Sequence, residues 1–201
     1  MRALGILVTA PIPGRVKLRL AGDVGPSTAT EVYWRLGRRV VEAVAGSGLR
    51  TVIWFTPAAE GAYVREWLDG VGRVEFRPQS EGHPGQRWQD AFARHFAEGA
   101  RRVVVVATDF PGLDRRLVVE AFTALGPADL VLGPATDGGL YLVGLRQPHR
   151  DLFAGISWTA GAARVQIQAR ARGLGLEVRG LKPLRPVDTL QDARVLGLLN
   201  S

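Results

Sequence analysis

Short apolar runs alternate along the chain with longer stretches in which apolar residues recur every three or four positions. A run that is apolar throughout is typical of a strand covered on both faces, and the longer spacing predicts a helix with one buried side. Strand and helix alternating in this way predict a three-layer α/β fold with a mostly parallel sheet. The predicted strands are residues 3–10, 51–55, 73–76, 103–107, 129–133, 140–145 and 176–180.

The connection between the fifth and sixth predicted strands departs from this alternation. It is only six residues long, 134–139, and contains Asp137, Gly138 and Gly139. An Asp-Gly pair between apolar runs is a strong hairpin signal, so we expect at least one antiparallel strand here. The hairpin accounts for Gly138 and leaves Asp137 free, beside backbone amides that can approach a ligand closely.

The central predicted strand, residues 103–107, is followed at once by a carboxylate. Asp109 comes just before Pro111 and Gly112, which force the backbone out of the sheet. Open α/β sheets bind their ligands at the carboxyl ends of their strands. Asp114 already provides a cap for the next helix, so Asp109 is a candidate site residue; the alternative is that it only organises the turn.

The loop after the first strand, residues 11–20, is basic and stiffened by proline. It contains Pro13, Gly14, Arg15, Lys17 and Arg19. Lysine and arginine are the residues that hold phosphate oxygens, one as a point charge and the other as a planar fork. The loop matches neither the P-loop nor the dinucleotide-binding pattern, and a solvated basic loop is the alternative.

Two capping boxes predict where helices begin. Thr28 with Glu31 marks one start, and Thr189 with Asp192 marks another near the end of the chain. Asp188 lies just outside the second box and is a carboxylate without an evident local role.

A polar loop at residues 77–86 follows the third predicted strand and contains two prolines and two glycines. Such a loop could close over a ligand, and His83 within it could contact that ligand. An ordinary surface loop is the simpler interpretation of His83.

Composition narrows the class of protein. The chain has 201 residues, 46% of them hydrophobic and 22% charged, as in an ordinary globular protein. No apolar run approaches the roughly 20 residues of a spanning helix, and there is no cysteine to form a disulfide or a thiolate metal site. We therefore expect one domain over residues 1–201, in the cytoplasm and without a membrane span.

The formal net charge is +7, which raises the question of nucleic-acid binding. The cations are scattered along the chain and form no run of five or more, so the sequence does not favour nucleic-acid binding. A phosphorylated small molecule is at least as good a partner.

The candidate residues predict a metal-assisted site at one edge of the sheet. Carboxylates on rigid turns, such as Asp109 and Asp188, suit a hard cation, Mg²⁺ or Mn²⁺. That ion would screen a pyrophosphate, while Lys17 and Arg19 would neutralise charge that develops during transfer.

Four motifs, taken together in order, resemble a bacterial family of GT-A-fold, glycosyltransferase-like proteins associated with radical-SAM and selenodomain proteins. They are P-x-P-G-R-V-K-x-R-L at residues 11–20, D-x-P-G-L at 109–113, G-P-A-x-D-G-G-x-Y-L-x-G at 133–144 and V-D-T-x-x-D at 187–192. The K-x-R-L element is also similar to that of phospholactate guanylyltransferase. The resemblance implies a nucleotide-diphospho-sugar transferase fold, a divalent ion near Asp109 and Asp188, and a nucleotide held by the loop from Pro11 to Arg19.

The chain departs from the family's usual residues at Leu18, His83, Trp88, Phe110 and Leu140. These changes leave the metal and phosphate residues in place and alter the walls beside them. An alternative is therefore a nucleotide-binding or partner-binding module of this fold with impaired catalysis.

Our functional hypothesis is a metal-dependent transferase acting by direct displacement. Its donor would be a nucleoside triphosphate or nucleotide sugar, and its acceptor a small molecule. Asp109, Lys17 and Asp137 would be catalytic, and Asp137 would lie on the donor-sugar or acceptor side with His83. Gly138 and Gly139 are assigned to that same side.

Overall fold

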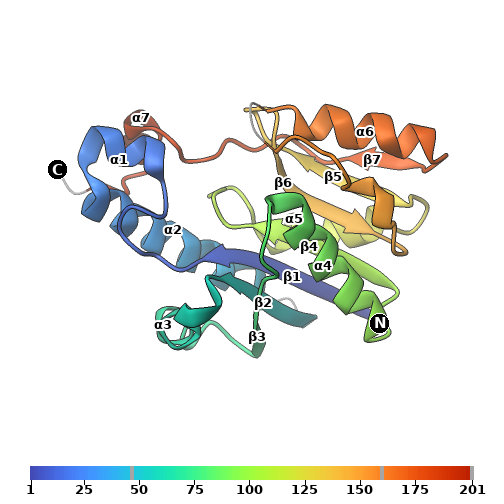
Figure 1. The fold of residues 1–201 in the computed structure, drawn as a ribbon, viewed down its shortest axis with the longest axis horizontal. Coiled ribbons are helices and arrows are strands. Elements are labelled where there is room, and N and C mark those ends of the chain that lie inside the picture. The colour runs from blue at the N-terminus through green and yellow to red at the C-terminus, as the bar shows by residue number, and fades with distance from the viewer. Residues whose placement is uncertain (46–47, 159–160, 200–201) are drawn as a thin grey trace.

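The structure is a computed structural model that describes residues 1–45, 48–158 and 161–199. Within these residues the strands form one sheet in the order β3-β2-β1-β4-β6-β5-β7 (Figure 1). β6 pairs antiparallel with both β4 and β5, and the other pairs are parallel, which confirms the predicted fold class and the hairpin. The strands are β1 (Arg2–Thr9), β2 (Arg50–Thr56), β3 (Val74–Pro78), β4 (Arg102–Ala107), β5 (Leu130–Pro134), β6 (Leu140–Leu145) and β7 (Val178–Gly180).

Helices cover both faces of the sheet. Apolar side chains of α1, α2, α3, α5 and α7 pack into a core on one face, and those of α4 and α6 pack on the other. The α-helices are α1 (Leu18–Val24), α2 (Pro26–Ala45), α3 (Gly61–Trp67), α4 (Pro84–Ala97), α5 (Arg115–Ala124), α6 (Ala163–Gly173) and α7 (Leu190–Val195), with short 3₁₀ turns η1 (Ala58–Glu60) and η2 (Arg150–Leu152).

The valine run of β4 shows why this strand is central. Val104 and Val106 belong to the core under α2 and α5, whereas Val103 and Val105 belong to the core under α4 and α6. All four valines are fully buried, because successive side chains of a strand point to opposite faces and both faces are covered.

The sheet has its topological switch point between β1 and β4. The chain passes outward from β1 to β2 and β3, then returns to place β4 on the other side of β1. β1 and β4 are parallel, with Leu7 opposite Ala107, so their carboxyl ends open side by side. This crevice is where open α/β sheets bind ligands, and the loops after the two strands meet there.

The region after β1 differs from its prediction in two ways. Residues 18–20, predicted as loop, begin helix α1, and α2 begins at Pro26 instead of being capped at Thr28. Proline suits the first position of a helix because its fixed φ is already helical and its missing N–H would have no partner there. The Thr30 hydroxyl donates a hydrogen bond to the Pro26 carbonyl oxygen at 2.7 Å, which stabilises this earlier start.

The segment after β7 carries the end of the chain back across the site. Leu184 forms an isolated parallel bridge with Ala135, and the Val187 amide donates to the carbonyl oxygen of Asp109 at 3.0 Å. Figure 1 shows this segment, in orange and red, running from β7 to α7, which lies beside α1. Asp188 is thereby placed at the carboxyl end of β4.

Candidate functional site

A buried lysine joins the two carboxylates that the sequence singled out. Lys17 Nζ forms an ion pair with Asp109 Oδ1 and a second with Asp188 Oδ1 at 3.2 Å. The lysine side chain is 4% exposed, whereas those of Asp109 and Asp188 are 39% and 42% exposed. The ammonium is therefore enclosed, and each carboxylate keeps a face open to solvent or ligand.

The backbone of Lys17 adopts a conformation that few residues other than glycine tolerate. Its φ of 49° and ψ of 46° lie in the left-handed region, and no other non-glycine residue in the described ranges has a positive φ. Lys17 immediately precedes α1, between the buried Val16 and the buried Leu20. Such strain persists only where surrounding packing imposes it, and it is most frequent at functional sites.

Two opposing effects act on the charge of Lys17. Burial disfavours the ammonium and would lower the pKa, but the charges and hydrogen bonds of Asp109 and Asp188 outweigh it and raise the pKa above its usual value. Lys17 is therefore a permanent cation at neutral pH. Burial and the Asp109 charge also raise the pKa of Tyr33, which lines the same cavity as Lys17 and whose hydroxyl accepts a hydrogen bond from the Thr9 amide at 3.0 Å.

Asp188 is positioned by the capping box of α7. Asp192 Oδ2 accepts hydrogen bonds from the Asp188 amide at 3.2 Å, from the Thr189 amide at 3.0 Å and from the Thr189 hydroxyl at 2.7 Å. Its other oxygen pairs with Arg185 at 2.8 Å. The box predicted from the sequence is present, and it fixes the backbone from which the Asp188 side chain projects.

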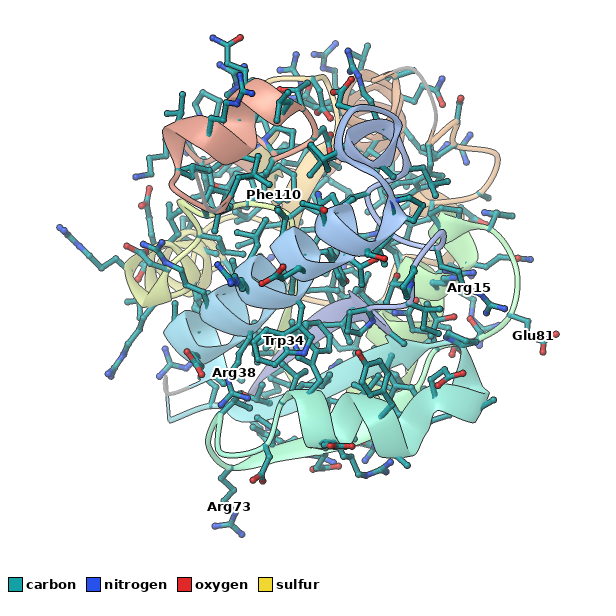
Figure 2. The ribbon with its side chains drawn as sticks, turned by 90° about the vertical axis from the view of Figure 1, so that its left-hand side faces the viewer. Arg15, Trp34, Arg38, Arg73, Glu81 and Phe110 are labelled. Carbon is teal, nitrogen blue, oxygen red and sulfur yellow. The ribbon has the colours of Figure 1, made fainter. Side chains whose placement is uncertain are left out.

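A cavity of about 350 Å³ lies over the ends of β1 and β4. Three cationic side chains line it: Arg15, Lys17 and Arg87. No partner for the side chains of Arg15 and Arg87 is found among the described residues, and Arg87 Nε is buried. Figure 2 shows Arg15 toward the same edge of the molecule as Glu81, which belongs to the segment between β3 and α4. The cavity thus offers unpaired cations suited to an anion.

Gln79 gives the same cavity a fixed polar group. Its amide Nε2 donates to the carbonyl oxygens of Val8 at 3.0 Å and Trp54 at 2.7 Å. Both N–H groups are used, which leaves Oε1 as an acceptor without a partner among the described residues.

A second cavity, of about 310 Å³, lies on the other side of Asp109. Asp137 and Gly139 line it together with Asp109 and Asp188. Two stacked indole rings form part of its wall, Trp88 and Trp158, with centroids 5.9 Å apart. Trp88, Ala107 and Asp109 line both cavities, so Asp109 stands where they meet.

The hairpin residues are shaped by local bonding. Asp137 Oδ1 accepts from the Gly139 amide at 2.9 Å, so one carboxylate oxygen takes part in the turn and the residue is not left free by the hairpin as predicted. Gly138 has a φ of 88°, and a Cβ there would lie 2.3 Å from the carbonyl oxygen of Gly161. Only glycine fits this position, and the turn is held against the residues before α6.

Five predicted site residues are absent from the linings of both cavities. Pro13 and Gly14 form an exposed turn, and Arg19 is exposed on α1. His83 is exposed at the N-terminus of α4, where its amide donates to Gln86 Oε1 at 3.2 Å. None of them is among the residues lining either cavity, and neither is Gly138, which contributes through the turn.

The structure adds site residues that the sequence had not assigned, Tyr33, Gln79, Arg87 and Trp158. Tyr33 could have been found, because it shares the helical spacing of the apolar face of α2. Gln79 lies in the polar segment 77–86 and Arg87 directly follows it, but no periodicity distinguishes them from surface residues.

The carboxylates of the site suit a hard divalent ion only if a bound substrate supplies further ligands to that ion. Within the described residues no cluster of three or more acidic, histidine or cysteine side chains is present. Mg²⁺ commonly binds through one or two carboxylates, with water and substrate phosphates as the remaining ligands. Asp109 and Asp188 fit this pattern, since both are partly exposed and both direct an oxygen at one cation position.

A family model described as an uncharacterized protein conserved in bacteria (DUF2064) matches residues 40–160. The chain belongs to this family. The matched part contains Asp109 and Asp137 but neither Lys17 nor Asp188. No curated protein matches the sequence.

Solved structures extend the likeness over nearly the whole chain. A protein of Desulfovibrio desulfuricans G20, assigned to the nucleotide-diphospho-sugar transferases, is 31% identical over 97% of this chain and 85% of that one, with a TM-score of 0.90. CMP:2-keto-3-deoxy-manno-octonic acid synthetase, solved with CTP, gives a TM-score of 0.55 at 13% identity and covers 98% of each chain. The 4-diphosphocytidyl-2C-methyl-D-erythritol synthase of Anaerococcus prevotii DSM 20548 gives 0.63 at 10% identity, over 96% of each chain.

These likenesses confirm the resemblance inferred from the motifs and the nucleotide-diphospho-sugar transferase fold. At 10–13% identity the two synthetases support the fold alone. In the described part of the chain, no helix combines the length and apolar character that crossing a membrane requires.

Proposed function

We propose that this protein is a metal-dependent transferase that uses a nucleotide-activated donor, a nucleoside triphosphate or a nucleotide sugar, and acts on a small acceptor. The observation that carries the proposal is the position of Asp109. This carboxylate lies at the end of the central strand, contacts a buried lysine and lines two cavities at once. A group there can act on a bond that joins ligands in the two cavities.

The cavity with Arg15, Lys17 and Arg87 is proposed to hold the donor phosphates. Unpaired guanidinium groups and a buried ammonium are the strongest partners that a protein offers a phosphate. The Gln79 oxygen, fixed in the same cavity, is available to a hydrogen-bond donor on the nucleotide. The CTP bound by one structural neighbour is consistent with this assignment.

The second cavity is proposed to hold the acceptor or the donor sugar. Asp137 would orient a hydroxyl group, and the faces of Trp88 and Trp158 would exclude water from it. The acceptor oxygen would attack the donor directly; its bond to the transferred group forms as the bond to pyrophosphate or to the nucleoside diphosphate breaks.

Asp109 and Asp188 are the residues that would hold Mg²⁺ or Mn²⁺. When bound, such an ion screens phosphate charge and stabilises the leaving group. Lys17, Arg15 and Arg87 would neutralise the charge that develops on the phosphate oxygens. A nucleotide donor also fits our expectation of a cytoplasmic protein.

The test begins with binding and proceeds to turnover. Melting temperatures are measured with nucleoside triphosphates and nucleotide sugars, each with and without Mn²⁺. A ligand that binds only the folded state, at a hundredfold excess over Kd, stabilises it by about 2.7 kcal/mol. Ligands that raise the melting temperature are then assayed with candidate acceptors. Pyrophosphate release indicates nucleotidyl transfer, and nucleoside diphosphate release indicates sugar transfer.

The results separate the proposed enzyme from a binding module. Binding with metal-dependent turnover supports the transferase. Binding without turnover across the donor and acceptor panel supports the module, for which the family departures around His83 and Trp88 are the sequence evidence. If no nucleotide stabilises the protein, both functions are wrong.

A further inference from the structure

The ammonium of Lys17 lies in the position that a metal ion would require. It contacts Oδ1 of Asp109 and Oδ1 of Asp188, the two carboxylates proposed to hold the ion. A Mg²⁺ ion binds its oxygens at about 2.0–2.1 Å, so an ammonium touching the same two oxygens leaves no room for it. The two cations also repel each other strongly at such a separation.

We propose that Lys17 is the resident cation of the ligand-free site and leaves the carboxylates only for donor phosphate oxygens. The site would then take a divalent ion together with a polyphosphate, and would bind the bare ion poorly. This inference rests on the donor site proposed above. It adds that the ion and the donor phosphates bind together.

Burial explains why the bare ion would bind poorly. The Lys17 side chain is only 4% exposed, so an ion that displaced it would leave a buried ammonium without a partner. Leaving one member of a buried ion pair unpaired is strongly unfavourable. That penalty is subtracted from whatever the ion gains by binding Asp109 and Asp188.

A polyphosphate removes this penalty because the exchange can take place within one cavity. Lys17 and Asp109 both line the cavity proposed for the donor, beside the unpaired Arg15 and Arg87. Phosphate oxygens there give the ammonium new partners and also supply ligands to the ion. By linkage, each ligand must then raise the affinity for the other by the same factor.

The decisive experiment measures Mn²⁺ binding to the nucleotide-free protein by electron paramagnetic resonance. We expect weak binding to the wild type and binding about tenfold tighter, or more, to Lys17→Met, which frees both carboxylates. The matched control is Arg15→Met, which removes the same charge from the same cavity and has no contact with either carboxylate. We expect it to change the Mn²⁺ affinity less than about threefold, the effect of a screened charge.

Two results would overturn the proposal. If Lys17→Met binds Mn²⁺ no better than the wild type, the lysine does not compete with the ion. If Arg15→Met gains as much as Lys17→Met, the gain reflects overall charge and not occupancy of the site. Melting curves of both variants establish that they are folded.

A measurement on the wild type applies even if Lys17→Met does not fold. The melting temperature is recorded with Mg²⁺ alone, with inorganic pyrophosphate alone and with both. We expect the shift with both to exceed the sum of the separate shifts. An additive result, or a shift with Mg²⁺ alone equal to that with both, contradicts the proposal.

These readouts do not depend on catalysis. A protein that shows the cation exchange but no turnover would retain this inference and lose the proposed transferase function. A protein with turnover and tight binding of bare Mn²⁺ would retain the proposed transferase function and lose this inference.

Discussion

Two clusters of charged side chains are built from the same kind of ion pair but differ in what they can do. The site cluster consists of Lys17, Asp109 and Asp188. The surface cluster consists of Arg50 and Arg77 from β2 and β3, Glu75 from β3, and Glu98 from the end of α4. In the surface cluster each arginine pairs with both glutamates, at distances that include 3.0 Å for Arg50 Nε to Glu75 Oε1 and 2.8 Å for Arg50 Nη2 to Glu98 Oε2.

The clusters differ in their balance of positive and negative charge and in their burial. The surface cluster has equal numbers of positive and negative groups, and all four side chains are 27–44% exposed. Its charges satisfy one another, so little is left for a ligand. The site cluster sets two carboxylates against one enclosed ammonium and keeps a net negative charge at the junction of two cavities. An incomplete, partly buried cluster is the one that can bind and exchange ligands.

The largest expected effect comes from removing the carboxylate that joins the cavities. We expect Asp109→Asn to lower donor turnover by about 100- to 1,000-fold, because it loses both the ion contact and the charge facing Lys17. The measurement is product release with the donor identified by the melting screen. Glu75→Gln, from the surface cluster, is the matched control and is expected to leave turnover unchanged. Equal losses in both variants would contradict the distinction between the clusters.

The next effect concerns His95, which is buried beside the surface cluster. His95 Nε2 accepts from Trp54 Nε1 at 3.2 Å. Burial lowers the pKa of His95 to about 4, with smaller contributions from Arg50 and Arg77 that are opposed by Glu98 and Glu75. Since the unfolded chain takes up the proton near pH 6.5, stability should fall between about pH 6.5 and 4, by at most about 1.4 kcal/mol per pH unit.

Urea denaturation across this pH range measures the effect. We expect His95→Gln to flatten the dependence, whatever its stability at neutral pH. An unchanged slope in His95→Gln would show that other groups cause the acid sensitivity.

A smaller effect is expected from the residue that positions Asp188. Asp192→Ala removes hydrogen bonds to Asp188 and Thr189 and should destabilise the protein by about 1–2 kcal/mol. It should also weaken Mg²⁺–pyrophosphate binding several-fold, because the backbone that carries Asp188 loosens. Denaturation and calorimetric titration measure the two effects. A loss of stability with unchanged binding would mean that Asp188 is held by other contacts.

The smallest effect belongs to the surface cluster itself. The hydrogen bond from Arg50 is the main reason that the pKa of Glu75 is lowered, with Arg77 adding to it. Because the group is exposed, we expect Glu75→Gln to cost less than about 1 kcal/mol near neutral pH. The difference from wild type should shrink in 1 M salt, where the Debye length is about 3 Å. A cost that persists in high salt would indicate packing instead of charge.

Much of the fold was predictable because its signals are local. The run of valines predicted β4, and the spacing of apolar residues predicted the helices. The pair Asp137-Gly138 predicted the hairpin. The Asp114 cap and the capping box of Thr189 and Asp192 also form as predicted. The start of α2 was missed because Pro26 and the box at Thr28 compete within three residues, and local rules do not rank them.

The residues of the site could likewise be predicted in part from the sequence, whereas the geometry of the site could not. The sequence predicted Lys17, Asp109 and Asp188 as site residues, yet 171 positions separate the lysine from Asp188. Nothing local encodes that the ammonium takes the position between the carboxylates. Nor does it encode that Arg19 and His83 face solvent while Arg87 lines the cavity. Those outcomes depend on how β1, β4 and the segment before α7 converge, and long-range packing decides them because it alone determines which side chains are enclosed.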